Sequence, residues 1–159
     1  GDSFIGVKPT KIGTCMQIEN IMTKELITLS MDEPLSKAKD IFESNTVHHL
    51  LITDDDGFLT GIITDRDIYK HLSPTAGTSQ ETHKDTAQLQ KKLHQIMARN
   101  LITVQAQHSL SESVLLFYDN HISCLPVVDK DNKLLGIITW RDILKVLAIQ
   151  YRKKQNASD

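Results

Sequence analysis

Threonine, arginine and aspartate stand within four residues of one another at two places in this sequence. The first set is Thr64, Arg66 and Asp67 in the stretch GIITDRDI (61–68), and the second set lies in GIITWRDI (136–143). A hydroxyl, a guanidinium and a carboxylate can together bind a nucleoside phosphate, because the guanidinium pairs with phosphate oxygens and the carboxylate accepts hydrogen bonds from ribose hydroxyls. The simpler interpretation is a helix cap, in which threonine and aspartate bind each other's backbone N–H groups.

Both interpretations place the motif where a strand runs into a helix. Ile62 and Ile63 suit a buried strand, and Thr64 suits the N-cap position of the helix that follows. At such a helix start, unpaired N–H groups and the helix dipole favour an anion such as phosphate. The occurrence of the phrase twice favours the binding interpretation.

The repeated phrase is part of a longer internal duplication with an offset of 75 residues. Between residues 21 and 72, 22 of 52 positions are identical to the residue 75 positions later, with no gap. Asp32 with Pro34 can begin the first helix of copy 1, and Ser109 with Glu112 form a capping box at its counterpart. Each copy predicts a strand, a helix, two strands joined by a hairpin turn, and a last helix. The expected strands are 26–29, 48–53 and 59–63 in copy 1, and 101–104, 123–128 and 134–138 in copy 2.

These elements predict an α/β (α+β) fold in which two matched β-α-β-β-α motifs pack face to face as an intramolecular pair. A unit of about 50 residues buries so small a share of its surface that it is only marginally stable alone, and pairing the copies solves this problem. Apolar residues at helical spacing also predict a helix over 86–97 that leads into copy 2. The expected organisation is an N-terminal tail (1–16), motif 1 (17–72), a polar linker (73–85), motif 2 with its leading helix (86–150) and a C-terminal tail (151–159).

Composition and charge argue against several other classes of protein. The net charge is −2 and the basic residues are scattered, which argues against a nucleic-acid partner. No apolar run approaches the ~20 residues that span a bilayer, and no signal peptide is visible, so we expect a cytoplasmic protein without a membrane partner. Cys15 and Cys124 are expected to be free thiols of a reducing compartment.

Neither a catalytic site nor a metal site is expected. His48 and His49 are neighbours on a strand, so their side chains point to opposite faces and cannot chelate one ion together. A Cys124–His49 nucleophile pair is conceivable, but no third residue that would orient it can be identified. The acidic run at 54–56 suits a solvated hairpin turn.

Two copies of strand–helix–strand–strand–helix, each ending on G-h-h-T-x-x-D, resemble a tandem pair of cystathionine-β-synthase (CBS) domains. The sequence LPVVD (125–129) adds to the resemblance, which covers about residues 17–150. It implies that the two motifs pack with pseudo-two-fold symmetry, as in a Bateman module, and that the clefts between them bind adenosine derivatives. The motif aspartate would hold the ribose, the motif threonine would contact the phosphate side, and the early and second strands would line the adenine pocket.

The family's binding residues can be carried over by position to give two clefts. Copy 1 has Leu51 where copy 2 has Pro126, and a His48–His49 pair where copy 2 has Ser123–Cys124, so the clefts are expected to differ in ligand or affinity. Cleft 1 would use Ile27, Thr28, His48, His49, Leu50, Thr64, Arg66 and Asp67. Cleft 2 would use Ile102, Thr103, Ser123, Cys124, Leu125, Thr139, Arg141 and Asp142.

The resemblance implies a regulatory module, not an enzyme, that senses AMP, ADP, ATP or S-adenosylmethionine and requires no other cofactor. Ligand would favour one relative orientation of the copies, and an effector protein or a second module would respond to it. A homodimer is expected, with the exposed last helices as the first candidate contact. The alternatives are a ligand-free assembly module, whose repeated phrases only cap helices, and an enzyme that hydrolyses a nucleotide. Trp140, which replaces Asp65 in the second phrase, would pack or contact a subunit, or stack near a ligand.

Overall fold

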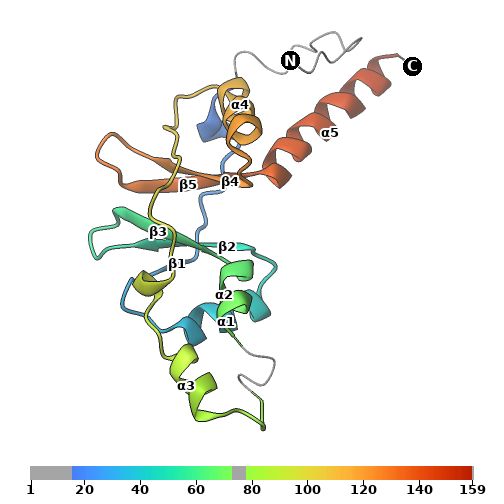
Figure 1. Ribbon diagram of the computed structural model, residues 1–159. Coiled ribbons are helices and arrows are strands. Elements are labelled where there is room, and N and C mark those ends of the chain that lie inside the picture. The colour runs from blue at the N-terminus through green and yellow to red at the C-terminus, as the bar shows by residue number, and fades with distance from the viewer. Residues whose placement is uncertain (1–15, 73–77, 159) are drawn as a thin grey trace.

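The computed structural model describes residues 16–72 and 78–158 and shows two sheets facing each other, with helices on their outer sides (Figure 1). This arrangement confirms the predicted α/β pair of motifs. Copy 1 contains β1 (Thr28–Leu29), α1 (Leu35–Ser44), β2 (His49–Thr53), β3 (Leu59–Thr64) and α2 (Asp65–His71). Copy 2 contains α4 (Leu110–Asn120), β4 (Cys124–Val128), β5 (Leu134–Thr139) and α5 (Trp140–Ala157). The 3-10 turn η1 (Ile18–Asn20) precedes copy 1. The helix α3 (His83–Leu89) and the 3-10 turn η2 (Leu93–Gln95) precede copy 2.

Each copy is built on an antiparallel hairpin. In copy 1, β1 pairs parallel to β2, and β2 pairs antiparallel to β3, while β4 and β5 form the corresponding hairpin of copy 2. Gly57 (φ 86°) and Asn132 (φ 69°) turn the two hairpins, because both residue types tolerate a positive φ. The strand predicted over 101–104 was wrong: its last residue alone pairs, with Val127, because Leu101 and Ile102 line a pocket instead of continuing the ladder.

The helix starts are capped partly as the sequence predicts. Ser109 and Glu112 form the expected capping box at α4. The predicted cap at Asp32 was wrong, because α1 begins only after Pro34 and the N–H of Leu35 donates to the backbone carbonyl of Lys91 at 2.8 Å. A segment that enters from elsewhere in the chain thus supplies the missing acceptor.

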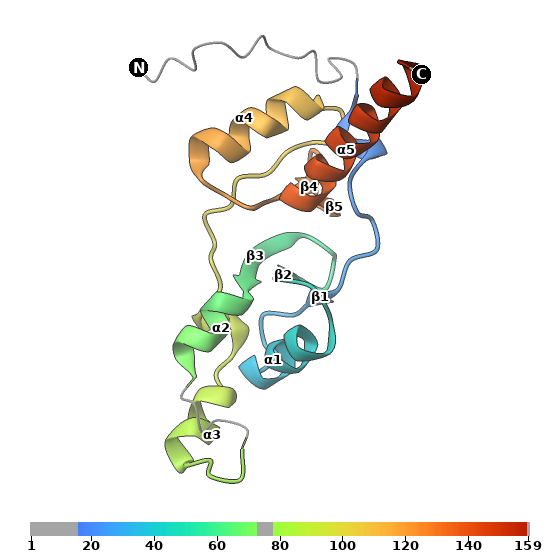
Figure 2. The same cartoon turned by 90° about the vertical axis from the view of Figure 1, so that its right-hand side faces the viewer.

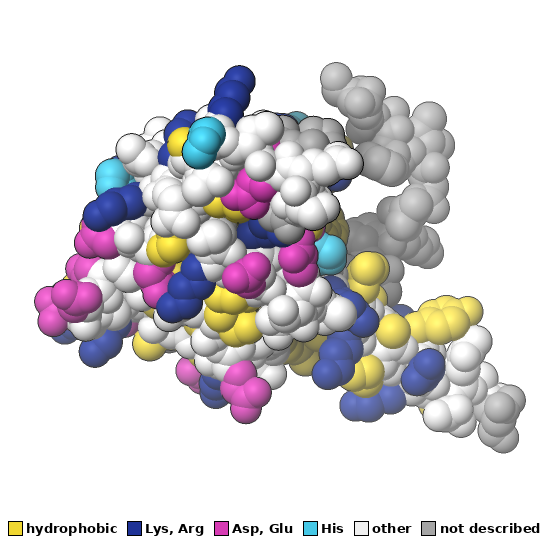
Figure 3. All heavy atoms as spheres, turned by 90° about the horizontal axis from the view of Figure 1, so that it is seen from below, with side chains coloured by type: hydrophobic (Ala, Val, Ile, Leu, Met, Phe, Trp, Pro, Cys, Tyr) yellow, Lys and Arg dark blue, Asp and Glu magenta, His cyan; other side chains and the backbone are white. Residues whose placement is uncertain are grey.

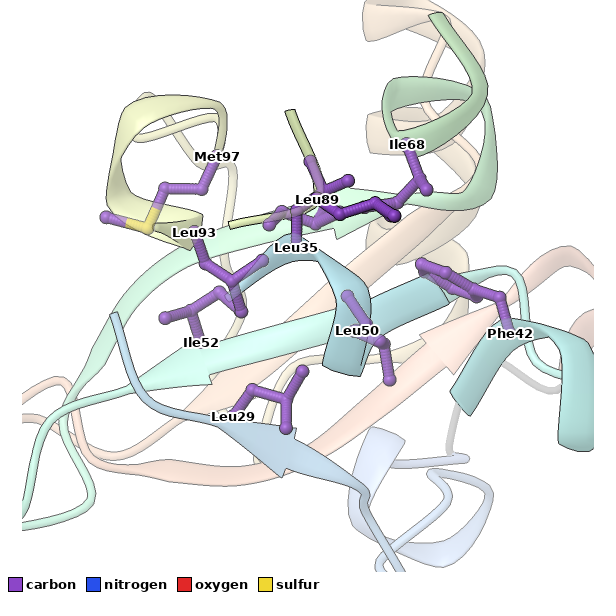
Figure 4. Packing of buried hydrophobic residues seen from close by; sticks show 11 residues of the cluster. Leu29, Leu35, Phe42, Leu50, Ile52, Ile68, Leu89, Leu93 and Met97 are labelled. Atoms are coloured by element: carbon purple, nitrogen blue, oxygen red, sulfur yellow. The ribbon is translucent and has the colours of Figure 1, made fainter. Parts of the chain in front are cut away.

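The segment that precedes copy 2 is not the single helix expected over 86–97. It forms α3, ends that helix at Leu89, and continues through η2. Its apolar side chains pack into the core of copy 1, where Leu93 is fully buried against Leu35 and Ile52 (Figure 4). The interruption follows from this packing, because the chain must follow the surface of copy 1 before it turns toward copy 2.

The segment before copy 1 makes the corresponding contact with copy 2. Ile18 in η1 is fully buried in the core of copy 2, together with Leu110, Phe117 and Leu125. Figure 2 shows both crossings: residues before β1 run from the copy 2 side toward copy 1, and residues after α3 run the opposite way. Each core is therefore completed by the segment that precedes the other copy.

Glycine at the start of each repeated phrase permits the two crossings. Residue 62 pairs with Ala98 across β3, and Thr23 pairs with residue 137 across β5. A Cβ on Gly61 would lie 2.5 Å from Sδ of Met97, and a Cβ on Gly136 would lie 2.8 Å from Sδ of Met22. The phrase begins with glycine because a second segment of backbone passes directly over it.

Parts of the predicted tails and linker fall outside the described residues. The N-terminal tail is described only at Met16, and residues 73–77 of the linker are not described. Residues 151–157 of the predicted C-terminal tail continue α5 as exposed helix. In the described parts of the chain, no helix combines the length and the apolar character needed to cross a bilayer.

Candidate functional site

A pocket of about 280 Å³ lies between the two copies. Its walls come from copy 1, from the segment that crosses to copy 2, and from the end of α4 with β4. A molecule bound there would contact both copies at once. The lining residues are His49, Ile62, Thr64, Ala98, Asn100, Leu101, Ile102, His121, Ile122, Ser123, Cys124 and Pro126.

A hydrogen bond joins the two copies at this pocket. Nε2 of His49, on β2, lies 2.9 Å from Oγ of Ser123, which directly precedes β4. Burial lowers the pKa of His49 below its ordinary value of 6.5, and the neighbouring His48 lowers it further. The imidazole is therefore neutral at pH 7, and it contributes a hydrogen bond rather than a positive charge.

The pocket combines residues that the sequence assigned to two separate clefts. His49 and Thr64 were assigned to cleft 1, whereas Ile102, Ser123 and Cys124 were assigned to cleft 2, and all five line the same pocket. The predicted grouping took each cleft from one copy. The structure mixes them because the chain crosses between the copies just before Ile102.

Several of the other predicted cleft residues do not line this pocket. Leu50 and Leu125 are buried in the two cores, and Thr28 pairs with Leu51 in the sheet. Thr103 lines a separate groove beside the β4–β5 hairpin. The side chains of Ile27, His48, Arg66 and Arg141 are exposed.

The start of α2 is capped by the chain itself. The backbone N–H of Thr64 donates to Oδ2 of Asp67 at 3.0 Å, and the N–H of Asp67 donates to Oγ1 of Thr64 at 3.2 Å. The N–H of Asp65 donates to the carbonyl of His48, and the N–H of Arg66 donates to Oδ1 of Asp65. The N–H groups that we expected to receive phosphate are thus already bound.

The start of α5 differs from that of α2. Oδ2 of Asp142 accepts from the N–H of Thr139 at 2.9 Å and from its hydroxyl at 3.3 Å, while Oδ1 accepts from the hydroxyl of Thr23 at 3.4 Å. Ala98 is the counterpart of Thr23 and has no hydroxyl to offer Asp67. Asp142 also lines a second groove, of about 510 Å³, between residues 16–23 and α5. The two motif aspartates therefore have different surroundings.

Trp140 packs within its own copy. Its ring centroid lies 5.2 Å from that of Phe117, and its Nε1 donates to the carbonyl of Ile122 at 3.1 Å. Because Ile122 lines the pocket, Trp140 holds that wall in place. At the equivalent position in copy 1, Oδ2 of Asp65 lies 2.9 Å from Nδ1 of His48. The residue at this position therefore anchors the segment before the second strand in both copies. Trp140 does so in copy 2 through an indole hydrogen bond, and Asp65 does so in copy 1 through its contact with His48.

Sequence reasoning missed much of the lining, including Ala98, Asn100, Leu101 and the residues 121–122 at the end of α4. An offset of 75 residues identifies which positions are equivalent, but it does not say which copy each segment contacts. The pattern Ile-Met, which occurs before both copies, marks the methionines that face the phrase glycines, but these methionines do not line the pocket.

The described residues do not form a metal centre: no group of three or more His, Cys, Asp or Glu side chains is placed to hold an ion. Cys124 is a free cysteine, and burial raises the pKa of its thiol to about 12. The conceivable Cys124–His49 nucleophile pair therefore lacks a thiolate at neutral pH. Cys15 lies outside the described residues.

The sequence pattern of the CBS domain matches residues 18–74 and 93–149. The chain belongs to the CBS domain family. This CBS pair is 33% identical over 131 residues to a CBS domain-containing protein of Dictyostelium discoideum, a match that covers 82% of this chain and 90% of that protein. It is also 31% identical over 127 residues to inosine-5′-monophosphate dehydrogenase of Methanocaldococcus jannaschii, which covers 80% of this chain but only 23% of the dehydrogenase.

A solved CBS pair has the same fold. The CBS domain pair of protein MJ0100, in complex with 5′-methylthioadenosine and S-adenosyl-L-methionine, matches with a TM-score of 0.69 and 29% sequence identity. The match covers 85% of this chain and 98% of that chain. The tandem CBS pair inferred from the repeated phrase is therefore confirmed.

Proposed function

We propose that this CBS pair is a regulatory module that binds an adenosine-containing compound in the pocket between its two motifs. The observation that carries the proposal is that both motifs contribute walls to one pocket and are joined across it by the His49–Ser123 hydrogen bond. The free energy of ligand binding then depends on how the motifs sit relative to each other. Occupancy shifts the population toward one arrangement, which an effector protein can detect.

The chemistry of the pocket and the relatives of the chain support an adenosine compound. Apolar side chains with a few hydroxyl and amide groups are typical of a pocket for a flat heterocycle. The CBS pair of MJ0100, which is 29% identical, is in complex with two adenosine compounds. AMP, ADP, ATP and S-adenosylmethionine are the candidates, with no further cofactor, and the proposed role is regulatory and cytoplasmic rather than catalytic.

A thermal-shift experiment with a matched pair of variants tests the site. Ile102→Trp places a large ring in the pocket, whereas Ile27→Trp changes the equivalent position of copy 1, which is 40% exposed and does not line the pocket. A ligand at 100 times its dissociation constant stabilises by about 2.7 kcal/mol. We expect the ligand to raise the melting temperature of the unchanged chain and of Ile27→Trp, and to leave that of Ile102→Trp unchanged.

Other results of that experiment count against the proposal. Equal shifts in all three proteins would place the ligand elsewhere. No shift with any of the four candidates at millimolar concentration would remove the sensor proposal. Release of phosphate from ATP or ADP above the buffer rate would instead favour the nucleotide-hydrolysing alternative.

A second candidate function is assembly, and exposed apolar side chains favour it. The helix that projects from the body in Figure 3 is α5, where apolar side chains stand among basic ones. We propose that these helices form a homodimer contact, which sedimentation of Leu144→Glu would test by loss of the dimer. The exposed large apolar residues of these helices are Leu115 and Tyr118 on α4 and Trp140, Leu144, Ile149 and Tyr151 on α5.

If the chain is an assembly module alone, Asp67→Ala or Asp142→Ala should lower the free energy of unfolding by only about 1 kcal/mol, which is the contribution of a helix cap.

A further inference from the structure

The pocket between the CBS motifs offers no permanently charged side chain to a ligand. Of the described residues that line it, none is Lys, Arg, Asp or Glu. Its polar groups include the hydroxyls of Thr64 and Ser123, the amide of Asn100 and the exposed imidazole of His121. The lowered pKa of His49 keeps that ring neutral, and the raised pKa of Cys124 keeps that thiol protonated. This lining therefore provides hydrogen-bonding groups and no permanent charge.

The surroundings of Thr64 are unfavourable to an anion. Asp65 and Asp67 both stand in the first turn of α2, directly after Thr64. Burial opposes ionisation of Asp65, but the hydrogen bonds from His48 and from the backbone N–H of Arg66, together with the two nearby imidazoles, outweigh it and hold the pKa of that carboxyl below its usual value. The backbone N–H groups of residues 65, 66 and 67 are all bound within the chain. A phosphate at this end of the pocket would lie near these carboxylates, which do not line the pocket themselves, without a matching cation or an open N–H at the start of α2.

Arg66 is the cation nearest to Thr64 in the sequence. Its side chain is exposed, and it is not among the residues that line the pocket. An exposed guanidinium in water and salt gives a phosphate only weak, screened attraction. The geometry therefore does not supply the ion pair that the sequence suggested.

We propose that this pocket selects adenosine compounds whose 5′ carbon bears a thioether or sulfonium group in place of phosphate. The inference rests on the proposed function and narrows its ligand class. The apolar side chains of Ile62, Ile102 and Ile122 suit a base and a sulfur substituent, which need no counter-charge. A sulfonium cation would in addition be favoured by the carboxylates at the start of α2.

Isothermal titration of the whole chain at pH 7.5 and 0.15 M salt tests this selectivity. The probes are 5′-methylthioadenosine, adenosine, AMP and ATP. We expect AMP and ATP to bind at least about ten-fold more weakly than 5′-methylthioadenosine, because their charge is not compensated in the pocket. AMP or ATP binding as tightly as the thioether overturns the inference while leaving the proposed function intact. Absence of binding by all four compounds overturns both.

A charge introduced into the lining gives an independent test. Asn100→Lys adds a cation to the pocket wall, and we expect it to strengthen AMP binding about ten-fold relative to 5′-methylthioadenosine. Asn100→Met has similar length without charge and is expected to bring no such gain. An equal gain in both variants overturns the inference. So does a selective loss of AMP binding in Arg66→Ala, because it would show that Arg66 already supplies the cation.

Discussion

His49 is the residue at which the chemistry of the pocket and the contact between the motifs coincide. It lines the pocket, bonds to Ser123 of the other motif, and is neutral because burial disfavours its charged form. Protonation would place a charge in a wall that has no acidic lining residue among those described. The stability of the pair is therefore linked to the protonation of this one ring.

That linkage predicts how stability depends on pH. The pKa of His49 is lower in the folded chain than its ordinary value of 6.5, so the unfolded chain binds more protons near and below that value. The stabilisation that neutral His49 contributes should thus be fully present above pH 6.5. The free energy of unfolding should fall as the pH drops below that value. Urea titrations of the unchanged chain and of His49→Gln at pH 5.0 and 7.5 measure the effect. His49→Gln should lose less stability on acidification, and an equal loss in both would contradict the prediction.

Individual capping residues were predictable from sequence, whereas the residues around the pocket were only partly so. The reciprocal cap of Thr64 and Asp67 was visible because both partners lie within one turn of helix. The bond of Leu35 to Lys91 was not visible, because its partners meet only after the chain has folded back. His49 was predicted to be a site residue, but its partner Ser123 was assigned to a different cleft.

The crossing segments are the elements on which the close packing of the two motifs depends. Each contributes a buried side chain to the core of one copy, Leu93 to copy 1 and Ile18 to copy 2, and then passes over the phrase glycine of that same copy. Met97 faces Gly61 and Met22 faces Gly136 at these points. The sequence predicted most of the strands and helices of the two copies from their periodicity, although not the lack of a strand over 101–104. It did not predict these crossings, because equivalent positions in a repeat look the same whichever copy they contact.

Alanine at a phrase glycine should weaken this packing. The Cβ of Gly61→Ala would lie 2.5 Å from Sδ of Met97 and 3.1 Å from the carbonyl oxygen of Ala98. The methionine can move but the backbone oxygen has little freedom, so we expect a loss of about 1–3 kcal/mol in the free energy of unfolding. Denaturant titration of Gly61→Ala and of its counterpart Gly136→Ala should give similar losses. A loss below about 0.5 kcal/mol at both positions would show that the segments lie less tightly than described.

On the scale of the whole molecule, neither CBS motif forms a complete hydrophobic core from its own residues. Leu89, Leu93 and Met97 come after the linker yet pack with copy 1, and Ile18 comes before copy 1 yet packs with copy 2. The sequence-based division into motif 1 (17–72) and motif 2 (86–150) follows the repeat, whereas the packing follows the crossings. A repeat in sequence and a unit of folding are different things in this chain.

Separate halves should therefore fail to fold alone. We expect residues 1–77 and residues 78–159, expressed as two polypeptides, to show no cooperative thermal transition individually, because each lacks buried side chains of its own core. Mixed in equal amounts, they should associate and recover a cooperative transition that depends on concentration. Circular dichroism and size-exclusion chromatography measure both properties. A cooperative transition of either half alone, close to that of the intact chain, would contradict the prediction.

The reciprocal crossings also bear on how such a chain arose by duplication. A single ancestral copy that carried its leading segment could have filled its own core only by receiving that segment from another, identical chain. The same contacts that now lie within one polypeptide describe a two-fold dimer with exchanged leaders. Fusion of two genes would then have turned an association between molecules into an intramolecular one, at an effective concentration set by the linker. Once the copies were joined, His49 and Ser123 could diverge from their counterparts, and a symmetric dimer could become an asymmetric pair.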